Sequence, residues 1–299
     1  MSALLTLLQL GLCLLLVAAA THLLRLARWA WRAPRRVDAA ASVRPLPVDD
    51  LPHITVQLPM YNERRVAARA ITAACALTYP RDRLHIQVLD DSTDDTRDLI
   101  DRTAADLRAA GHDVVVLRRP DRRAFKAGNL AHGLANLRAD CPFVAILDAD
   151  FVPPPDFLTR LLPSFQEGAD AQQVGFVQAR WAFLNGEQNL LTRLQALILD
   201  GLMAVEQAYL DAHGKPLQWN GTGGIWRTQA LIDAGGWLGS GASTSVLTED
   251  LDVSYRALLR GYRGRQRADV SVPSELPAAM SIFLTQQQLW VQASRAAEK

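Results

Sequence analysis

The sequence lacks several features that would place it in other classes of protein. Its three cysteines, Cys13, Cys75 and Cys141, are scattered without a CxxC spacing, so we expect neither a disulfide framework nor a zinc cluster. The formal net charge is +1, whereas proteins that bind nucleic acid usually present a strongly basic face. The six histidines form no i, i+4 pair, and we expect them to be surface or core residues rather than ligands.

The N-terminal segment lacks charged side chains altogether. Residues 1–24 contain no Asp, Glu, Lys or Arg, and about 20 apolar helical residues span the roughly 30 Å core of a bilayer. Arginines and two interfacial tryptophans follow directly: Arg25, Arg28, Trp29, Trp31, Arg32, Arg35 and Arg36. A cleaved signal peptide is the alternative, but its positive charge would precede the apolar run. We therefore expect residues 1–36 to form an uncleaved transmembrane anchor whose basic flank lies in the cytoplasm.

The rest of the chain predicts a linker over residues 37–52 and then an α/β domain over 53–275. Apolar runs typical of strands cover 54–58, 85–89, 114–117 and 143–147, and Pro59 is expected to end the first of them. Helical patterns cover 63–77, 92–110 and 126–137, followed by 156–165, 188–211 and 251–259, with one further strand at 174–178. This alternation predicts a mostly parallel open sheet with right-handed crossovers.

Acidic clusters follow two of the predicted strands. They are Asp90-Asp91-Ser92 and Asp148-Ala149-Asp150, and a third triplet, Thr248-Glu249-Asp250, begins a predicted helix. In open α/β sheets, ligands bind just beyond the carboxyl ends of the strands. Asp148 and Asp150 would repel each other without a cation, and Mg²⁺ or Mn²⁺ prefers such oxygen ligands together with substrate phosphates. We therefore expect a metal–phosphate site at this edge.

The remaining candidates each have a structural alternative. Asp90 and Asp91 could bind a ribose or a base edge, or simply favour the dipole of the following helix. Asp250 could act as a general base, or the triplet could cap its helix. Lys126 could bind phosphate at a helix start, or be an ordinary solvated lysine. The turn from Pro59 to Glu63 could offer polar atoms to a ligand, or use Asn62 as a helix cap.

The motifs, taken in order, resemble the family 2 glycosyltransferases, in particular the cellulose-synthase-like and glucomannan-synthase-like branch. The matching stretches are Val56–Glu63, Leu89–Asp94, Phe125–Leu130, Asp148–Phe151, Val177–Trp181, Asn220–Gly224, Thr248–Asp250 and Gln286–Trp290. The resemblance implies a GT-A fold, which is Rossmann-like, and an inverting transfer of a hexose from a nucleotide-diphosphate sugar, with Mg²⁺ or Mn²⁺ as cofactor.

The resemblance also implies a role for each motif residue. Asp148 and Asp150 would hold the metal, and Asp250 would be the catalytic base. The donor-binding residues would be Pro59, Tyr61, Glu63, Asp90, Asp91, Lys126 and Asp148, with the two acids of the Asp-Asp-Ser stretch on the nucleoside. The acceptor-binding residues would be Asn220, Gly221, Thr222, Gln286 and Trp290, with the tryptophan ring stacked on a sugar.

Two departures from the family pattern concern the C-terminal region. Residues 276–299 are expected to form an interface helix, but the family's QxxRW motif reads Gln286-Gln287-Gln288-Leu289-Trp290, so Leu289 stands in place of the arginine. Family members usually continue into further membrane helices, whereas this sequence ends at Lys299. Three interpretations stay open: a fragment, a single-anchor enzyme or a degenerate copy.

The expected function is transfer from a UDP- or GDP-sugar to a growing β-linked polysaccharide. The enzyme would lie in a bacterial inner membrane or an endomembrane, with its catalytic domain in the cytoplasm and no nucleic acid as partner. One alternative is a lipid acceptor, as in the ceramide glucosyltransferases. Another is a low-activity or non-catalytic homologue that binds sugar nucleotides. Export or assembly subunits are further candidate partners.

Overall fold

The computed structural model describes residues 2–32, 46–239 and 248–297, and side chains from Leu5 to Gln288 within those ranges. Its centre is a seven-stranded sheet in the order β3-β2-β1-β4-β6-β5-β7. The strands are β1 (Ile54–Met60), β2 (Leu84–Asp90), β3 (Asp113–Leu117), β4 (Phe143–Ile146), β5 (Val174–Phe183), β6 (Gly224–Arg227) and β7 (Arg263–Ser274). β1 to β4 are parallel, β6 runs antiparallel to both of its neighbours, and β5 is parallel to β7. The predicted α/β class with a mostly parallel sheet is confirmed.

The sheet is buried on both faces, and its strand β4 is apolar at every position. In β4, Phe143 and Ala145 pack into the hydrophobic cluster on one face, while Val144 and Ile146 pack into the cluster on the other. This alternation follows from the two-residue period of a strand. The helices α3 (Ala67–Cys75), α4 (Thr96–Ala109) and α6 (Phe157–Leu161) cover the first face. The second is covered by α5 (Phe125–Ala135), α9 (Thr228–Asp233) and α10 (Glu249–Leu259).

The structure corrects the prediction that Pro59 ends the first strand, because Pro59 lies inside β1 and is aligned with Leu89 of β2. A proline in a central strand removes a donor from the ladder. Here β4 pairs only with positions 54–57 of β1, and the N–H of Leu147 makes the last bond on that side, to the oxygen of Gln57. The nitrogen of Pro59 therefore faces a side on which β4 has already ended.

Several helix boundaries also differ from those expected. α4 begins at Thr96, whose N–H donates to Asp94 Oδ1, so neither Ser92 nor Thr93 is the cap. Asn62 does not cap a helix either, because its side-chain oxygen accepts the N–H of Thr93. The predicted stretch 188–211 is divided into α7 (Leu190–Asp200), a π-helical turn (Gly201–Gln207) and α8 (Ala208–Ala212).

Strand β7 was missed from the sequence because it begins with three arginines in five residues, Arg263, Arg265 and Arg267. These side chains leave the strand to pair with acids: Arg263 and Arg265 with Asp170, and Arg267 with Asp269. The ion pairs explain how a strongly charged segment can form a strand of the sheet.

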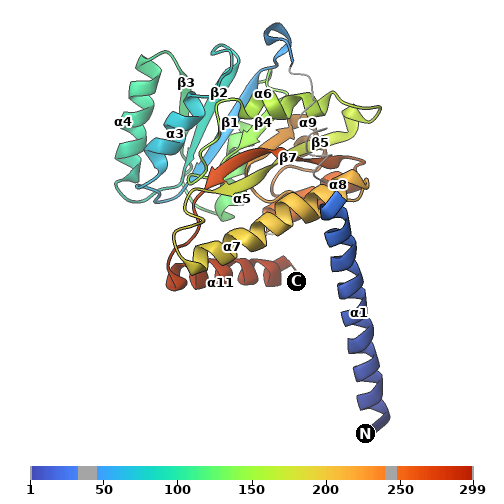
Figure 1. Ribbon diagram of the computed structural model, residues 1–299. Helices are drawn as coiled ribbons and strands as arrows, with labels where there is room; N and C mark the ends of the chain where they lie inside the picture. The colour runs from blue at the N-terminus through green and yellow to red at the C-terminus, as the bar shows by residue number, and fades with distance from the viewer. Residues whose placement is uncertain (1, 33–45, 240–247, 298–299) are drawn as a thin grey trace.

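The N-terminal helix α1 (Ser2–Arg32) projects away from the domain, with its N-terminus at the far end (Figure 1). Leu5–Arg32 is long and apolar enough to cross a bilayer, and none of its most apolar window is buried. At its C-terminal end Trp29 packs edge-on against Tyr209 of α8, with ring centroids 5.9 Å apart. The helices α7 and α11 (Met280–Ala297) lie beneath the sheet on the side toward which α1 extends (Figure 1).

Candidate active site

The centre of the candidate site is the Asp148-Ala149-Asp150 turn, directly after β4. The backbone N–H of Asp148 donates a 2.8 Å hydrogen bond to Oγ1 of Thr222, which comes from the loop before β6. Thr222 is buried, and the N–H of the next residue, Gly223, donates to the carbonyl of Ile146. The antiparallel pairing of β4 with β6 thus places two distant motifs against each other.

Lys126 joins this turn from the first turn of α5. Its ammonium group lies 2.6 Å from Oδ1 of Asp148 and donates to the carbonyl oxygen of Gly221 at 3.2 Å. Gly221 has a φ of +83°, which favours glycine, and a Cβ atom built there would lie 3.4 Å from Oδ2 of Asp250. Residues 126, 148, 221 and 250 are therefore brought together by the fold.

Several acidic side chains lie close together at this position, and burial raises their pKa values. Burial, followed by repulsion from Asp148 and Glu63, raises the pKa of Asp150 to about 6. Burial also raises the pKa of Glu249 to about 7, against the opposing attraction of Lys126. The pKa of Asp250 is raised by burial as well, although the N–H of Leu251 stabilises its charged form.

Glu63 belongs to the same group electrostatically. Burial and the charge of Asp148 raise its pKa above the usual value. The Lys126 ammonium, whose pKa is raised by Asp148 and Glu249 against the effect of burial, balances part of the negative charge. A cation held by Asp148 and Asp150 would relieve the remaining repulsion, so the carboxylates present fit Mg²⁺ or Mn²⁺.

Asp90 and Asp91 are each held by an arginine. Arg118 Nε lies 2.7 Å from Oδ2 of the fully buried Asp90 carboxylate. Arg119 makes a two-bond fork to Asp91, at 2.8 and 2.6 Å, and also donates to the carbonyls of Arg123 and Phe125. The pairs fix the loop that leads into α5 and to Lys126. A nucleoside-binding role for the two acids stays a prediction.

The same loop holds a second polar feature that we did not predict. The guanidinium of Arg122 lies 3.4 Å from the centroid of the Tyr61 ring and 5.0 Å from that of Phe125. Tyr61 is exposed, on the turn that follows β1 and Pro59. The sequence did contain a signal, because a run of arginines follows β3 immediately before the lysine motif.

A buried glutamine, Gln178, holds the backbone of the loop formed by Asn220, Gly221 and Thr222. Gln178 Nε2 donates to the carbonyl of Thr222 at 2.7 Å, and its oxygen accepts the N–H of Asn220 at 3.3 Å. Trp181 Nε1 donates to the same Thr222 carbonyl. The hydroxyl of Thr222 is used on Asp148, so its contact with an acceptor sugar, like that of Asn220 and Gly221, remains a prediction.

The C-terminal motif lies on α11. Gln286 is half-buried there, whereas the side chains of Leu289 and Trp290 lie outside the described residues. The loop before Thr248 also lies outside them, over 240–247. The acceptor role given to Gln286 and Trp290 therefore stays a prediction.

Comparison with known proteins identifies the family. Residues 55–220 match the sequence profile of Glycosyl transferase family 2. The chain belongs to this family. The match begins in β1 and ends at the loop that contacts Lys126, so it includes both the Asp-Asp-Ser and Asp-x-Asp turns.

Two curated plant proteins show which members of family 2 the chain is similar to. It is 38% identical over 265 residues to "Glucomannan 4-beta-mannosyltransferase 1" of Oryza sativa subsp. japonica, covering 86% of this chain and 49% of that protein. It is 40% identical over 243 residues to "Glucomannan 4-beta-mannosyltransferase 2" of Arabidopsis thaliana, covering 81% and 44%. The chain therefore spans less than half of the length of these relatives.

A solved structure supports the GT-A fold. The chain superposes on the mannosyltransferase PcManGT from Pyrobaculum calidifontis, in complex with GDP-Man and Mn²⁺, with a TM-score of 0.64. The match covers 95% of this chain and 75% of that one, at 21% sequence identity. At this identity the likeness shows a shared fold.

Proposed function

We propose that the chain is a metal-dependent, inverting mannosyltransferase that uses GDP-mannose to extend a β-1,4-linked polysaccharide. The observation that supports this best is the meeting of Lys126, Asp148 and Asp250 around Gly221. The names of the plant relatives support the sugar and the linkage, and the GDP-Man complex of PcManGT supports the nucleotide.

In the proposed reaction, Asp250 accepts the proton of the acceptor hydroxyl as that oxygen attacks the anomeric carbon. Burial raises the pKa of Asp250, which makes it a stronger base than an exposed aspartate. One displacement breaks the bond to the diphosphate and inverts the anomeric centre. Asp148 and Asp150 would hold Mg²⁺ or Mn²⁺, which neutralises diphosphate charge when bound. The Lys126 ammonium, 2.6 Å from Asp148, adds a second cationic group for the same charge.

We propose further that the domain lies against the cytoplasmic surface of a membrane. Besides α1, α7 exposes apolar side chains at a spacing that places them on one face: Leu190, Leu194, Leu197 and Ile198. The start of α11 exposes Met280, Ile282 and Leu284. A reporter fused after Arg36 should be cytoplasmic, and an external reporter would contradict this orientation.

The deciding experiment uses the full chain in detergent with Mn²⁺, a β-mannan oligosaccharide and either GDP-mannose or UDP-glucose. GDP-mannose should be consumed faster, and the product should be a longer oligosaccharide that a β-mannanase digests. A product that partitions into organic solvent would instead indicate a lipid acceptor. Preference for UDP-glucose would contradict the proposed donor.

A further inference from the structure

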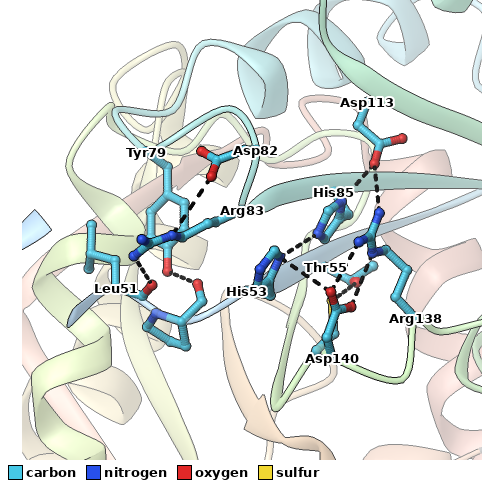
Figure 2. A network of polar contacts seen from close by, with 12 residues as sticks. Leu51, His53, Thr55, Tyr79, Asp82, Arg83, His85, Asp113, Arg138 and Asp140 are labelled. Carbon is cyan, nitrogen blue, oxygen red and sulfur yellow. Dashed lines mark hydrogen bonds and ion pairs between the residues drawn. The ribbon is translucent and has the colours of Figure 1, made fainter. Parts of the chain in front are cut away.

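Two histidines that are 32 residues apart in sequence lie in contact near the amino ends of β1 and β2 (Figure 2). His53 precedes β1, and His85 is the second residue of β2. Nδ1 of His53 lies 3.0 Å from Nε2 of His85, and the rings are parallel with centroids 5.3 Å apart. His85 is buried, as expected of a core histidine, and the contact between the two rings is a feature that the sequence did not predict.

We propose that His53, His85 and Asp140 form a second cation site, suited to a borderline transition metal such as Zn²⁺. One ligand atom from each, the two imidazole nitrogens and a carboxylate oxygen, lie within 4.8 Å of one another. Imidazole with carboxylate is a typical ligand set for Zn²⁺, whereas Mg²⁺ prefers oxygen ligands alone.

The orientation of His85 is the first support for the proposal. Its Nδ1 lies 2.7 Å from Oδ2 of Asp113, and its side chain is only 7% exposed. Because an ionised carboxylate only accepts hydrogen bonds, the proton lies on Nδ1 and the lone pair of Nε2 faces His53. A carboxylate that fixes the second nitrogen in this way is the usual partner of a metal-bound histidine.

The local charge is the second support. Asp113 and Asp140 both lie near Arg138, whose guanidinium makes a fork to Asp140 at 3.1 and 3.0 Å and lies 3.9 Å from Asp113. Two carboxylates here lie near one guanidinium, so the acidic side chains outnumber the arginine. The two carboxylates would partly neutralise the charge of a bound divalent ion.

The movement needed to bind an ion is small. Tetrahedral Zn²⁺ with bonds of about 2.0–2.1 Å places its ligand atoms roughly 3.3 Å apart. The two nitrogens, now at 3.0 Å, must separate by a few tenths of an ångström, and Oδ2 of Asp140, now 3.8 Å from His53 Nδ1, must approach. Asp140 is 47% exposed on the loop before β4, so it has room to move, and water can supply the fourth ligand.

The site is separate from the catalytic one. Because β1, β2 and β4 are parallel, their amino ends meet at one edge and their carboxyl ends at the other. The seven residues of β1 span about 20 Å at the usual rise per residue. An ion here would link the segments before β1 and β4 to β2, and so stabilise the sheet rather than take part in sugar transfer.

The test uses the full chain in detergent, stripped with EDTA and returned to a large excess of Mg²⁺ to occupy oxygen-ligand sites. One equivalent of Zn²⁺ is added, and retained zinc and Tm are measured after desalting. We expect about one zinc per chain and a higher Tm. Co²⁺ in place of Zn²⁺ should give the visible absorption of a tetrahedral nitrogen–oxygen site.

Variants separate the outcomes. His53→Gln should lose the zinc, and His213→Gln, on an exposed residue near α8, should keep it. Asp113→Asn should weaken zinc binding by about 10–100-fold, and Asp150→Asn should leave it unchanged. If His53→Gln does not fold, Asp140→Asn replaces it. No zinc retained by the native chain, or equal retention in the folded His53→Gln or Asp140→Asn variant, would overturn the proposal and leave a hydrogen-bonded histidine pair.

Discussion

The ammonium group of Lys126 lies 2.6 Å from the carboxylate of Asp148, although the two residues belong to different elements, α5 and the turn after β4. Both side chains are about one-third exposed, at 30% and 31%, so the ion pair itself adds at most about 1 kcal/mol to stability. Its importance is positional. It keeps a positive charge beside the carboxylates that we propose for the metal and the donor diphosphate.

Replacing Lys126 by methionine should therefore weaken donor binding more than folding. Loss of a charge-assisted contact of about 1.5–3 kcal/mol would raise the KM for GDP-mannose by roughly ten- to a hundredfold. Steady-state kinetics with varied donor measure this. Lys215→Met, at an exposed position, removes the same charge and should have no effect. Equal KM values for the two variants would contradict a role for Lys126 at the diphosphate.

Asp250→Asn should slow transfer strongly while donor binding remains. Removing a general base typically costs about 10²–10⁴-fold in rate, whereas the amide keeps the size of the side chain. In this variant the rate of GDP-mannose consumption should fall, whereas the thermal shift caused by GDP-mannose and Mn²⁺ should remain. Glu187→Gln, on a 90% exposed side chain, is the control for loss of one acid. Unchanged turnover in Asp250→Asn would instead favour the non-catalytic, sugar-nucleotide-binding alternative.

Thr222→Val should reduce both stability and kcat, because it leaves the N–H of Asp148 without its hydroxyl acceptor. An unsatisfied buried donor costs about 1–3 kcal/mol, which urea denaturation can measure. Thr222→Ser keeps the hydroxyl and should retain most of the activity. Equal stability and kcat in the valine and serine variants would show that this hydrogen bond does not position the Asp148 turn.

The affinity for Mn²⁺ should fall as the pH is lowered through about 6. The raised pKa of Asp150 means that its carboxyl is protonated below that pH, so the ion must displace a proton. Affinity should fall by up to about tenfold per pH unit below 6 and change little above 7. Calorimetric titration of the chain between pH 5 and 8 tests this. Asp150→Asn should bind weakly and show a flatter pH profile, and a native affinity equal at pH 5 and 7 would refute the assignment.

Leu289→Arg restores the arginine of the family motif and should raise activity, by roughly ten- to a hundredfold if the arginine contacts the leaving diphosphate. The measurement is kcat with saturating donor. Leu289→Met is a control for size without charge. An active protein in which the arginine variant shows no gain would mean that this motif position does not limit the rate.

Much of the architecture was predictable because its signals are local. Apolar runs of the right length predicted the strands β1 to β4, and the charge-free segment predicted α1. The acidic residues at the ends of β2 and β4 followed from the same pattern. The predictions were wrong where residues distant in the sequence determine the local structure. Pro59 is tolerated inside β1 because the neighbouring strand β4 ends early. β7 forms because its arginines are paired with acids.

The sequence by itself determined the strands β1 to β4, the apolar helix α1 and the family motifs, since each depends on residues that are close to one another in the chain. Tertiary structure alone decided that Gly221 lies between Lys126 and Asp250, that Asp90 and Asp91 are held by Arg118 and Arg119, and that His53 meets His85. These contacts depend on strand order and register, which are set by packing of the whole sheet and leave no periodic signal in the chain.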